Sequence, residues 1–153
     1  MLETPHVVVG AAIAASVSNP MLSLPLALGS HFLLDRIPHW NPHTYTETEK
    51  YGKIRNSSMI IASVDTAIAF LIGSYIAYTY LPDYKMSFVI ITACFLSVLP
   101  DVIKSPFYLM KNKNGLLKKY INFERSLQVE IGIYLGLLTQ LLVITTGLWW
   151  IFG

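Results

Sequence analysis

The sequence predicts an all-α integral membrane protein, folded as one helical bundle over residues 1–153. Of its residues, 54% are hydrophobic and only 13% are charged, whereas soluble domains typically carry about 25% charged residues. The mean hydropathy is +0.52. Three apolar runs approach or exceed the roughly 20 residues that cross a hydrocarbon core. Since no repeat or linker divides the chain, we treat it as a single membrane-embedded domain.

The three long apolar runs cover residues 58–81, 86–103 and 127–152. Their lengths predict three transmembrane helices. We expect the second helix to stop at Leu99-Pro100-Asp101, because proline removes a helical hydrogen bond and crowds the preceding turn.

Two shorter apolar segments, residues 6–18 and 21–37, precede these runs and are separated by Asn19-Pro20. They predict a short N-terminal helical hairpin. Buried against the long helices, such a hairpin can keep its polar backbone groups away from lipid. Whether it spans the membrane or only dips into it stays open at this stage.

Residues 106–124 mix aromatic and aliphatic side chains with lysines. This pattern favours an interfacial amphipathic segment, and the alternative is a basic loop that only fixes the topology.

The distribution of basic residues predicts the orientation in the membrane. In the five-segment topology, ten of the eleven Lys and Arg residues fall on the side of the 36–57 and 104–126 connections, and only Lys85 falls on the other. The ten are Arg36, Lys50, Lys53, Arg55, Lys104, Lys111, Lys113, Lys118, Lys119 and Arg125. By the positive-inside rule this side faces the cytoplasm.

Several functional classes lack support in the sequence. The net charge is +2 with no long basic tract, so a nucleic-acid partner is not expected. Cys94 is the single cysteine, which excludes an intramolecular disulfide and a cysteine-based zinc site. The motifs of serine hydrolases, P-loop proteins, zincins and dinucleotide-binding proteins are absent. Any metal site must therefore use histidine and carboxylate ligands.

All four histidines lie in the first 43 residues. His31 and Asp35 are four residues apart, so on a helix they share one face and can bind one divalent cation. His39 continues this spacing beyond Pro38, and His43 follows Pro42. The alternative for any single histidine is an interfacial or hydrogen-bonding role. An acid such as Asp35 within an apolar segment is nevertheless costly unless it is paired or ligated.

Other acids lie toward the same predicted end of the bundle, namely Asp65, Asp101, Glu124 and Glu130. Polar groups from all five segments therefore converge on one face of the membrane. The alternatives are a helix–helix hydrogen bond for Asp65 or Glu130, and helix capping for Asp101.

Three elements follow one another in the chain: Thr4-Pro5-His6, the block from Gly29 through His31-Phe-Leu-Leu-Asp35 to His39-Trp-Asn, and Leu99-Pro100-Asp101. With them the chain resembles small prokaryotic membrane-bound metal-dependent hydrolases, which implies a protein of the prokaryotic plasma (inner) membrane. The HxxxD element is also similar to that of the zinc-dependent phospholipase C and P1 nuclease superfamily. There, histidine and aspartate ligands on helices hold zinc ions that activate water for attack on a phosphoester.

The resemblance implies a hydrolase that acts on a phosphoester or another membrane-associated substrate and uses a divalent metal, which we expect to be zinc. It implies His6, His31, Asp35 and Asp101 as ligands, with His39 and His43 as further candidates. Asp65 or Glu124 would orient the attacking water. The alternatives are a non-catalytic membrane protein with a structural His/Asp or metal cluster, and a small transporter.

Gly132 and Gly136 form a GxxxG pattern, which brings helices into close contact. We favour an intramolecular contact over an oligomer interface.

Overall fold

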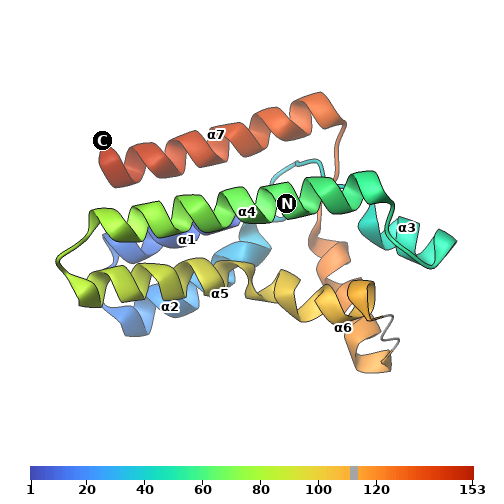
Figure 1. The fold of residues 1–153 in the computed structure, drawn as a ribbon, viewed down its shortest axis with the longest axis horizontal. Coiled ribbons are helices and arrows are strands. Elements are labelled where there is room, and N and C mark those ends of the chain that lie inside the picture. Colours follow the sequence, from blue (N-terminus) through green and yellow to red (C-terminus); the bar gives the residue numbers. More distant parts are fainter. Residues whose placement is uncertain (111–113) are drawn as a thin grey trace.

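The computed structural model describes residues 1–110 and 114–153. Within these residues the chain is helical, as predicted, and three of the helices are long and apolar enough to cross a membrane: α4, α5 and α7. The helices are α1 (Glu3–Ser16), α2 (Pro20–Leu34), α3 (Thr44–Tyr51), α4 (Asn56–Thr79), α5 (Tyr84–Leu109), α6 (Gly115–Leu127) and α7 (Ile133–Phe152). The predicted fold class, a helical membrane bundle, is confirmed. Figure 1 shows α3 and α6 at one end and the C-terminus at the other.

The short helix α1 is the central packing element of the bundle, since it contacts α2, α4, α5 and α7. Small side chains allow this close packing, and Gly10 is the tightest point toward α5. A Cβ atom at Gly10 would lie 2.8 Å from Ser97 Oγ and 2.9 Å from the Ala93 carbonyl oxygen. The backbones of α1 and α5 therefore approach as closely as a glycine permits.

The hairpin predicted from Asn19-Pro20 is present. The Asn19 side chain accepts a hydrogen bond from the Met21 amide at 3.0 Å, and Pro20 occupies the first turn of α2. Such capping fixes the start of a helix. At the tip of the hairpin, the Trp150 indole donates to Ser16 Oγ at 2.6 Å. The hairpin tip therefore lies beside the C-terminal end of α7.

The expected stop of the second long helix at Pro100 is wrong. Helix α5 continues through both Pro100 and Pro106 to Leu109. A proline removes only one backbone donor, and the buried Pro100 side chain packs inside the protein, so tertiary contacts outweigh the local cost. As a consequence, Lys104 lies about one turn beyond Asp101 on the same side of α5.

The predicted start of the last span at residue 127 is also wrong. Helix α6 ends at Leu127, α7 begins at Ile133, and the intervening residues pair with the segment after α2. The Val129 amide donates to the Asp35 carbonyl at 3.1 Å, and the His39 amide donates to the Val129 carbonyl at 3.0 Å. These bonds hold the segment extended, because its backbone groups find partners outside a helix.

The two glycines of the GxxxG pattern differ in their surroundings. A Cβ atom at Gly136 would overlap the Trp40 backbone nitrogen, whereas one at Gly132 would meet nothing within 4 Å. Gly136 therefore permits an intramolecular contact between α7 and the loop that follows α2.

Of the residues 106–124, those up to Leu109 belong to α5 and those from Gly115 onward belong to α6, which buries Ile121 and Glu124. Helix α3 was not predicted.

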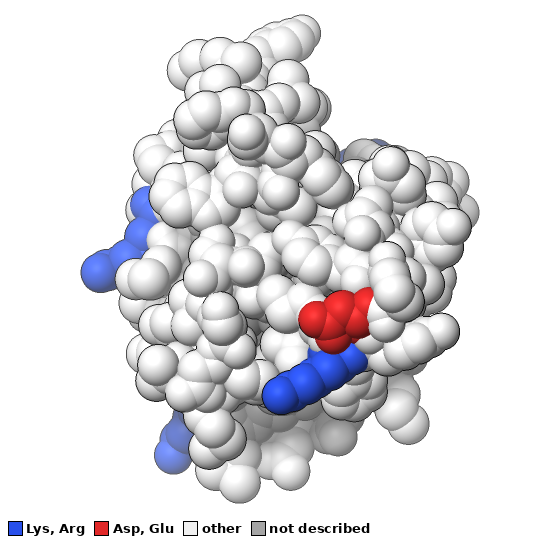
Figure 2. Space-filling view, turned by 90° about the vertical axis from the view of Figure 1, so that its left-hand side faces the viewer, with Lys and Arg blue, Asp and Glu red and all other residues white. Residues whose placement is uncertain are grey.

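Figure 2 shows the end that carries the C-terminus and the α4–α5 turn, and few charged side chains are visible there. Lys111 and Lys113, two of the predicted cytoplasmic lysines, lie outside the described residues.

Candidate metal centre

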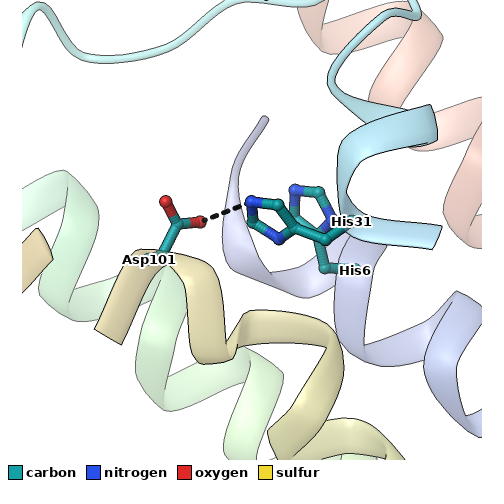
Figure 3. A group of neighbouring side chains, drawn as sticks. All are labelled: His6, His31 and Asp101. Atoms are coloured by element: carbon teal, nitrogen blue, oxygen red, sulfur yellow. Dashed lines mark ion pairs between the residues drawn. The ribbon is translucent and has the colours of Figure 1, made fainter. Parts of the chain in front are cut away.

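Five of the predicted site residues meet in one buried cluster, which we call the His/acid cluster. They come from four helices and one helix end: His6 from α1, His31 from α2, Asp35 at the C-cap of α2, Asp101 from α5 and Glu124 from α6. The side chains of His6, His31 and Glu124 are fully buried, and that of Asp101 is 17% exposed. Figure 3 shows His6, His31 and Asp101 together.

His31 lies at the middle of the cluster, and its ring orientation is fixed from outside. Its Nδ1 lies 2.8 Å from the Ser97 carbonyl oxygen, which accepts a hydrogen bond and so places the proton on Nδ1. The Nε2 lone pair then faces the acids. The distances from Nε2 are 3.5 Å to Asp35 Oδ2, 3.9 Å to Asp101 Oδ2 and 3.7 Å to Glu124 Oε1. Histidine metal ligands are commonly oriented by such a second hydrogen bond.

His6 stacks on His31, with ring centroids 4.2 Å apart and the planes inclined by 19°. Its Nε2 lies 3.5 Å from Asp35 Oδ1. In the described part of the chain, neither ring nitrogen of His6 has a hydrogen-bond partner. A buried imidazole without partners is costly, which suggests that a ligand belongs beside it.

Asp35 links both histidines, since its two carboxylate oxygens face His6 and His31 respectively. Its Oδ1 also lies 2.5 Å from the backbone nitrogen of Met1. Burial alone would raise the pKa of the Asp35 carboxyl, but the nearby His6 imidazole and the positive Met1 nitrogen hold it well below its usual range. Asp35 is therefore an anion, as a metal ligand must be.

Lys104 is the residue that the sequence reasoning missed. Its side chain is buried, and the ammonium pairs with Asp101 Oδ1 and Glu124 Oε1. The sequence assigns Lys104 only to the membrane topology, because the second long apolar helix is predicted to end before it. The signal was present in the spacing of Asp101 and Lys104, since residues three apart are neighbours on a continuous helix.

The other two candidate histidines do not join the cluster. His39 is buried, and its Nε2 is 4.0 Å from Asp35 Oδ1. Both of its nitrogens have protein partners, however: Nδ1 donates to the Ile37 carbonyl at 2.7 Å, and Asn41 donates to Nε2 at 3.1 Å. Burial lowers the pKa of the His39 imidazole. We therefore interpret His39 as a neutral structural residue at the edge of the cluster.

His43 lies farther out. Its side chain is 62% exposed, and its Nδ1 is 3.8 Å from Glu130 Oε2. This pair is at the surface, where an ion pair contributes little.

Asp65 is also placed outside the cluster. Its carboxylate accepts hydrogen bonds at the start of α1, from the Glu3 amide at 2.5 Å and from Thr4 Oγ1 at 2.6 Å. It thereby satisfies backbone donors that the first turn of a helix leaves unpaired. The helix–helix hydrogen bond that we considered as an alternative for Asp65 is thus observed.

Gln140 is a second residue that the sequence reasoning missed. It is buried in α7, donates to the Trp40 carbonyl at 2.9 Å and accepts from the Leu2 amide at 2.8 Å. Gln140 thus joins the segment after α2 to the start of α1, which carries His6.

A cavity of about 710 Å³ adjoins the cluster. Charged residues line it, among them Asp101, Lys104, Glu3 and Arg125. Its walls also include apolar residues of α4 and α5: Met59, Ala62, Phe70 and Leu109. The cluster therefore adjoins a space that is lined by both charged and apolar side chains.

The residues of the cluster fit a divalent metal ion. The candidate ligand atoms form two groups, and the atoms of each group all lie within 4.8 Å of one another. One group comes from His6, His31 and Asp101, and the other comes from His31, Asp35 and Glu124. In the described residues, His31 Nε2 and Glu124 Oε2 are buried without a hydrogen-bond partner, as are both nitrogens of His6. Imidazole nitrogen and carboxylate oxygen together are a ligand set typical of zinc.

Comparisons of the chain with protein-family models, curated proteins and solved structures found no match. The resemblance to membrane-bound metal-dependent hydrolases therefore stays a prediction from the motifs.

Proposed function

We propose that the protein is a metal-dependent hydrolase of the prokaryotic plasma membrane, with its centre facing the cytoplasm. Zinc is the proposed metal, and a phosphoester or another membrane-associated substrate is the proposed target. The observation that carries this proposal is the buried His/acid cluster, in which imidazole nitrogens lack partners beside three carboxylates.

The charges of the cluster support a bound cation. Asp35, Asp101 and Glu124 are three carboxylates in contact with His31, and Lys104 is the cation that pairs with two of them. The positive Met1 nitrogen pairs with Asp35. With neutral histidines, this set leaves one negative charge in excess, because three negative charges meet two positive charges. Buried charge without compensation is strongly unfavourable, and a metal ion would compensate it.

The side chains have distinct proposed roles. His6, His31, Asp35 and Asp101 would hold the metal, and Ser97 orients His31 through its carbonyl. When bound, zinc supplies Lewis acidity for the activation of water. Of the two acids assigned to orienting that water, Glu124 lies in the cluster and has one free buried oxygen, Oε2, among the described residues. Asp65 is engaged at the start of α1.

The cavity supports a membrane-associated substrate. It follows α4 from Met59 to Phe70, a length of about 16 Å at 1.5 Å per residue, and α4 is one of the helices able to cross a membrane. Asp101 and Lys104 also line it. Such a lining suits a molecule that carries both a polar group and an apolar part.

The test is metal analysis and hydrolysis by the same preparation. Protein purified in detergent is stripped with a chelator, reloaded with zinc, and assayed against phospholipids and a generic phosphodiester. We expect zinc-dependent release of product, which is lost on chelation and restored by zinc. Protein that binds zinc tightly but hydrolyses none of these substrates would contradict the proposal for these substrate classes.

A structural role for the metal is the second candidate, because the ligands come from α1, α2, α5 and α6. An ion held by four helices would tie the hairpin to the bundle. In that case, chelation should unfold the protein in a thermal scan, and no substrate should be turned over.

A further inference from the structure

We infer that Lys104 is a built-in second cation of the centre, which limits it to one metal ion per chain. This inference rests on the proposed metal-binding function and concerns how many ions the centre holds. It follows from the contacts of Lys104 and from the single available nitrogen of His31.

The two candidate ligand groups cannot both be complete at once. Both groups contain His31, and its Nδ1 is engaged with the Ser97 carbonyl. The remaining nitrogen, Nε2, has one lone pair and can bind one ion. Two complete three-ligand sites would need a second nitrogen at this position, which the ring does not offer.

Lys104 holds the carboxylate oxygens that a second ion would need. Asp101 presents Oδ2 to His31 and Oδ1 to the Lys104 ammonium. In centres with two metals about 3.5–4 Å apart, a bridging carboxylate likewise gives one oxygen to each cation. Here the ammonium takes the place of one of the two metals on Asp101. It also contacts Glu124 Oε1, which belongs to the other ligand group.

The burial of Lys104 supports this role over that of a surface lysine. Only 7% of the residue is exposed, and it lies between α5 and α6 rather than in the solvent. A buried ammonium is retained at such a position when acids compensate its charge. Lys118 provides the contrast, because its pair with Glu49 is at the surface, with side chains 46% and 39% exposed.

Lys104 also lines the cavity, as do Asp101 and Ser105. An ammonium has three donors, and the two carboxylates engage two of them. The positive charge therefore stands between the metal ligands and the space that would receive a substrate.

The test is zinc stoichiometry, measured by mass spectrometry of the metal in purified, chelator-stripped and reloaded protein. We expect about one zinc per chain in the unmodified protein and about two in Lys104→Asp. The substitution removes the cation, and it adds a carboxylate beside Asp101 and Glu124 that can replace His31 as a ligand of the second ion. Lys118→Asp makes the same charge change at the surface, and it should keep one zinc.

A second variant guards against misfolding of Lys104→Asp. Lys104→Met removes only the charge, and it should bind zinc at least about tenfold more tightly in competition with a coloured chelator, because a nearby positive charge opposes the ion. Two zinc ions in the unmodified protein would overturn the inference. So would unchanged stoichiometry in a folded Lys104→Asp together with unchanged affinity in Lys104→Met.

These results also separate this inference from the proposed function. If the unmodified protein binds one zinc and the Lys104 variants behave like it, only the role of Lys104 is wrong. If no form of the protein binds zinc, the proposed metal-binding function is wrong, and the inferred role of Lys104 is wrong as well.

Discussion

At the scale of single residues, the centre depends on how each histidine uses its two nitrogens. The Nδ1 atom of His31 donates a hydrogen bond to the Ser97 carbonyl, and its Nε2 atom faces three carboxylates. His39 uses both nitrogens for hydrogen bonds to Ile37 and Asn41. Two histidines that look alike in the sequence therefore have different capacities for binding a metal.

Removal of a ligand from the cluster should abolish metal binding without unfolding the chain. We expect His31→Ala and Asp35→Asn each to weaken zinc binding by at least about 100-fold, since even outer-shell partners of a metal site contribute about 10–100-fold. Equilibrium dialysis measures the affinity, and circular dichroism checks the helix content. His43→Ala is the control and should bind zinc normally, because His43 lies outside the cluster.

Asp65 should behave differently from the cluster residues. Asp65→Ala is expected to destabilise the protein by about 0.5–2 kcal/mol, the usual cost of losing a helix cap, because Glu3 and Thr4 lose their acceptor. Its zinc content should not change. Thermal unfolding and metal analysis test this, with Thr66→Ala as the control, since the Thr66 hydroxyl donates to the Ala62 carbonyl of its own helix. Loss of zinc from a folded Asp65→Ala protein would place Asp65 in the metal centre instead.

At the scale of helices, the sequence predicted elements where a local pattern was sufficient. Run length identified the three spans, and Asn19-Pro20 identified the hairpin turn. The spacing of His31 and Asp35 correctly predicted that their side chains lie close together.

The errors arose where contacts distant in the sequence decide the structure. Pro100 stays inside α5, and residues 128–132 pair with the segment after α2. Lys104 reaches the centre because α5 continues past Pro100 and because Lys104 pairs with Glu124 of α6. No local pattern shows which helix will lie opposite Lys104, so this part of the site could not be read from the sequence.

The close packing of α1 on α5 gives a prediction with a matched control in the hairpin. Gly10→Ala should destabilise the protein by about 1–3 kcal/mol, the usual cost of overpacking, because the new Cβ atom meets Ser97 and the Ala93 backbone. Gly29→Ala should have little effect or stabilise α2, since its Cβ atom would meet nothing within 4 Å. The midpoints of thermal unfolding in detergent compare the two, and equal midpoints would contradict this packing.

At the scale of the whole molecule, charged side chains are concentrated toward the end of the bundle that carries α3 and α6. The cluster lies beside the N-terminus of α1, which Figure 1 shows between that end and the C-terminal end. The opposite end, with the α4–α5 turn, carries few charges on the face shown in Figure 2. This asymmetry underlies the proposed orientation in the membrane.

Cysteine labelling in intact cells tests that orientation. In a Cys94→Ala background, Thr48→Cys and Lys119→Cys should resist an impermeant thiol reagent added outside, because the positive-inside rule places them in the cytoplasm. Lys85→Cys, near the α4–α5 turn, should react. The reverse pattern of labelling would mean that the cluster faces the outside.

The central claim is that the His/acid cluster holds a divalent metal ion, and X-ray diffraction at the zinc absorption edge tests it most directly. Crystals of zinc-loaded protein should show an anomalous peak beside His31 Nε2, with ligands about 2.0–2.2 Å away drawn from His6, His31 and the acids Asp35, Asp101 and Glu124. A cluster with no such peak under saturating zinc, or zinc bound only at the exposed His43 and Glu130, would contradict the account.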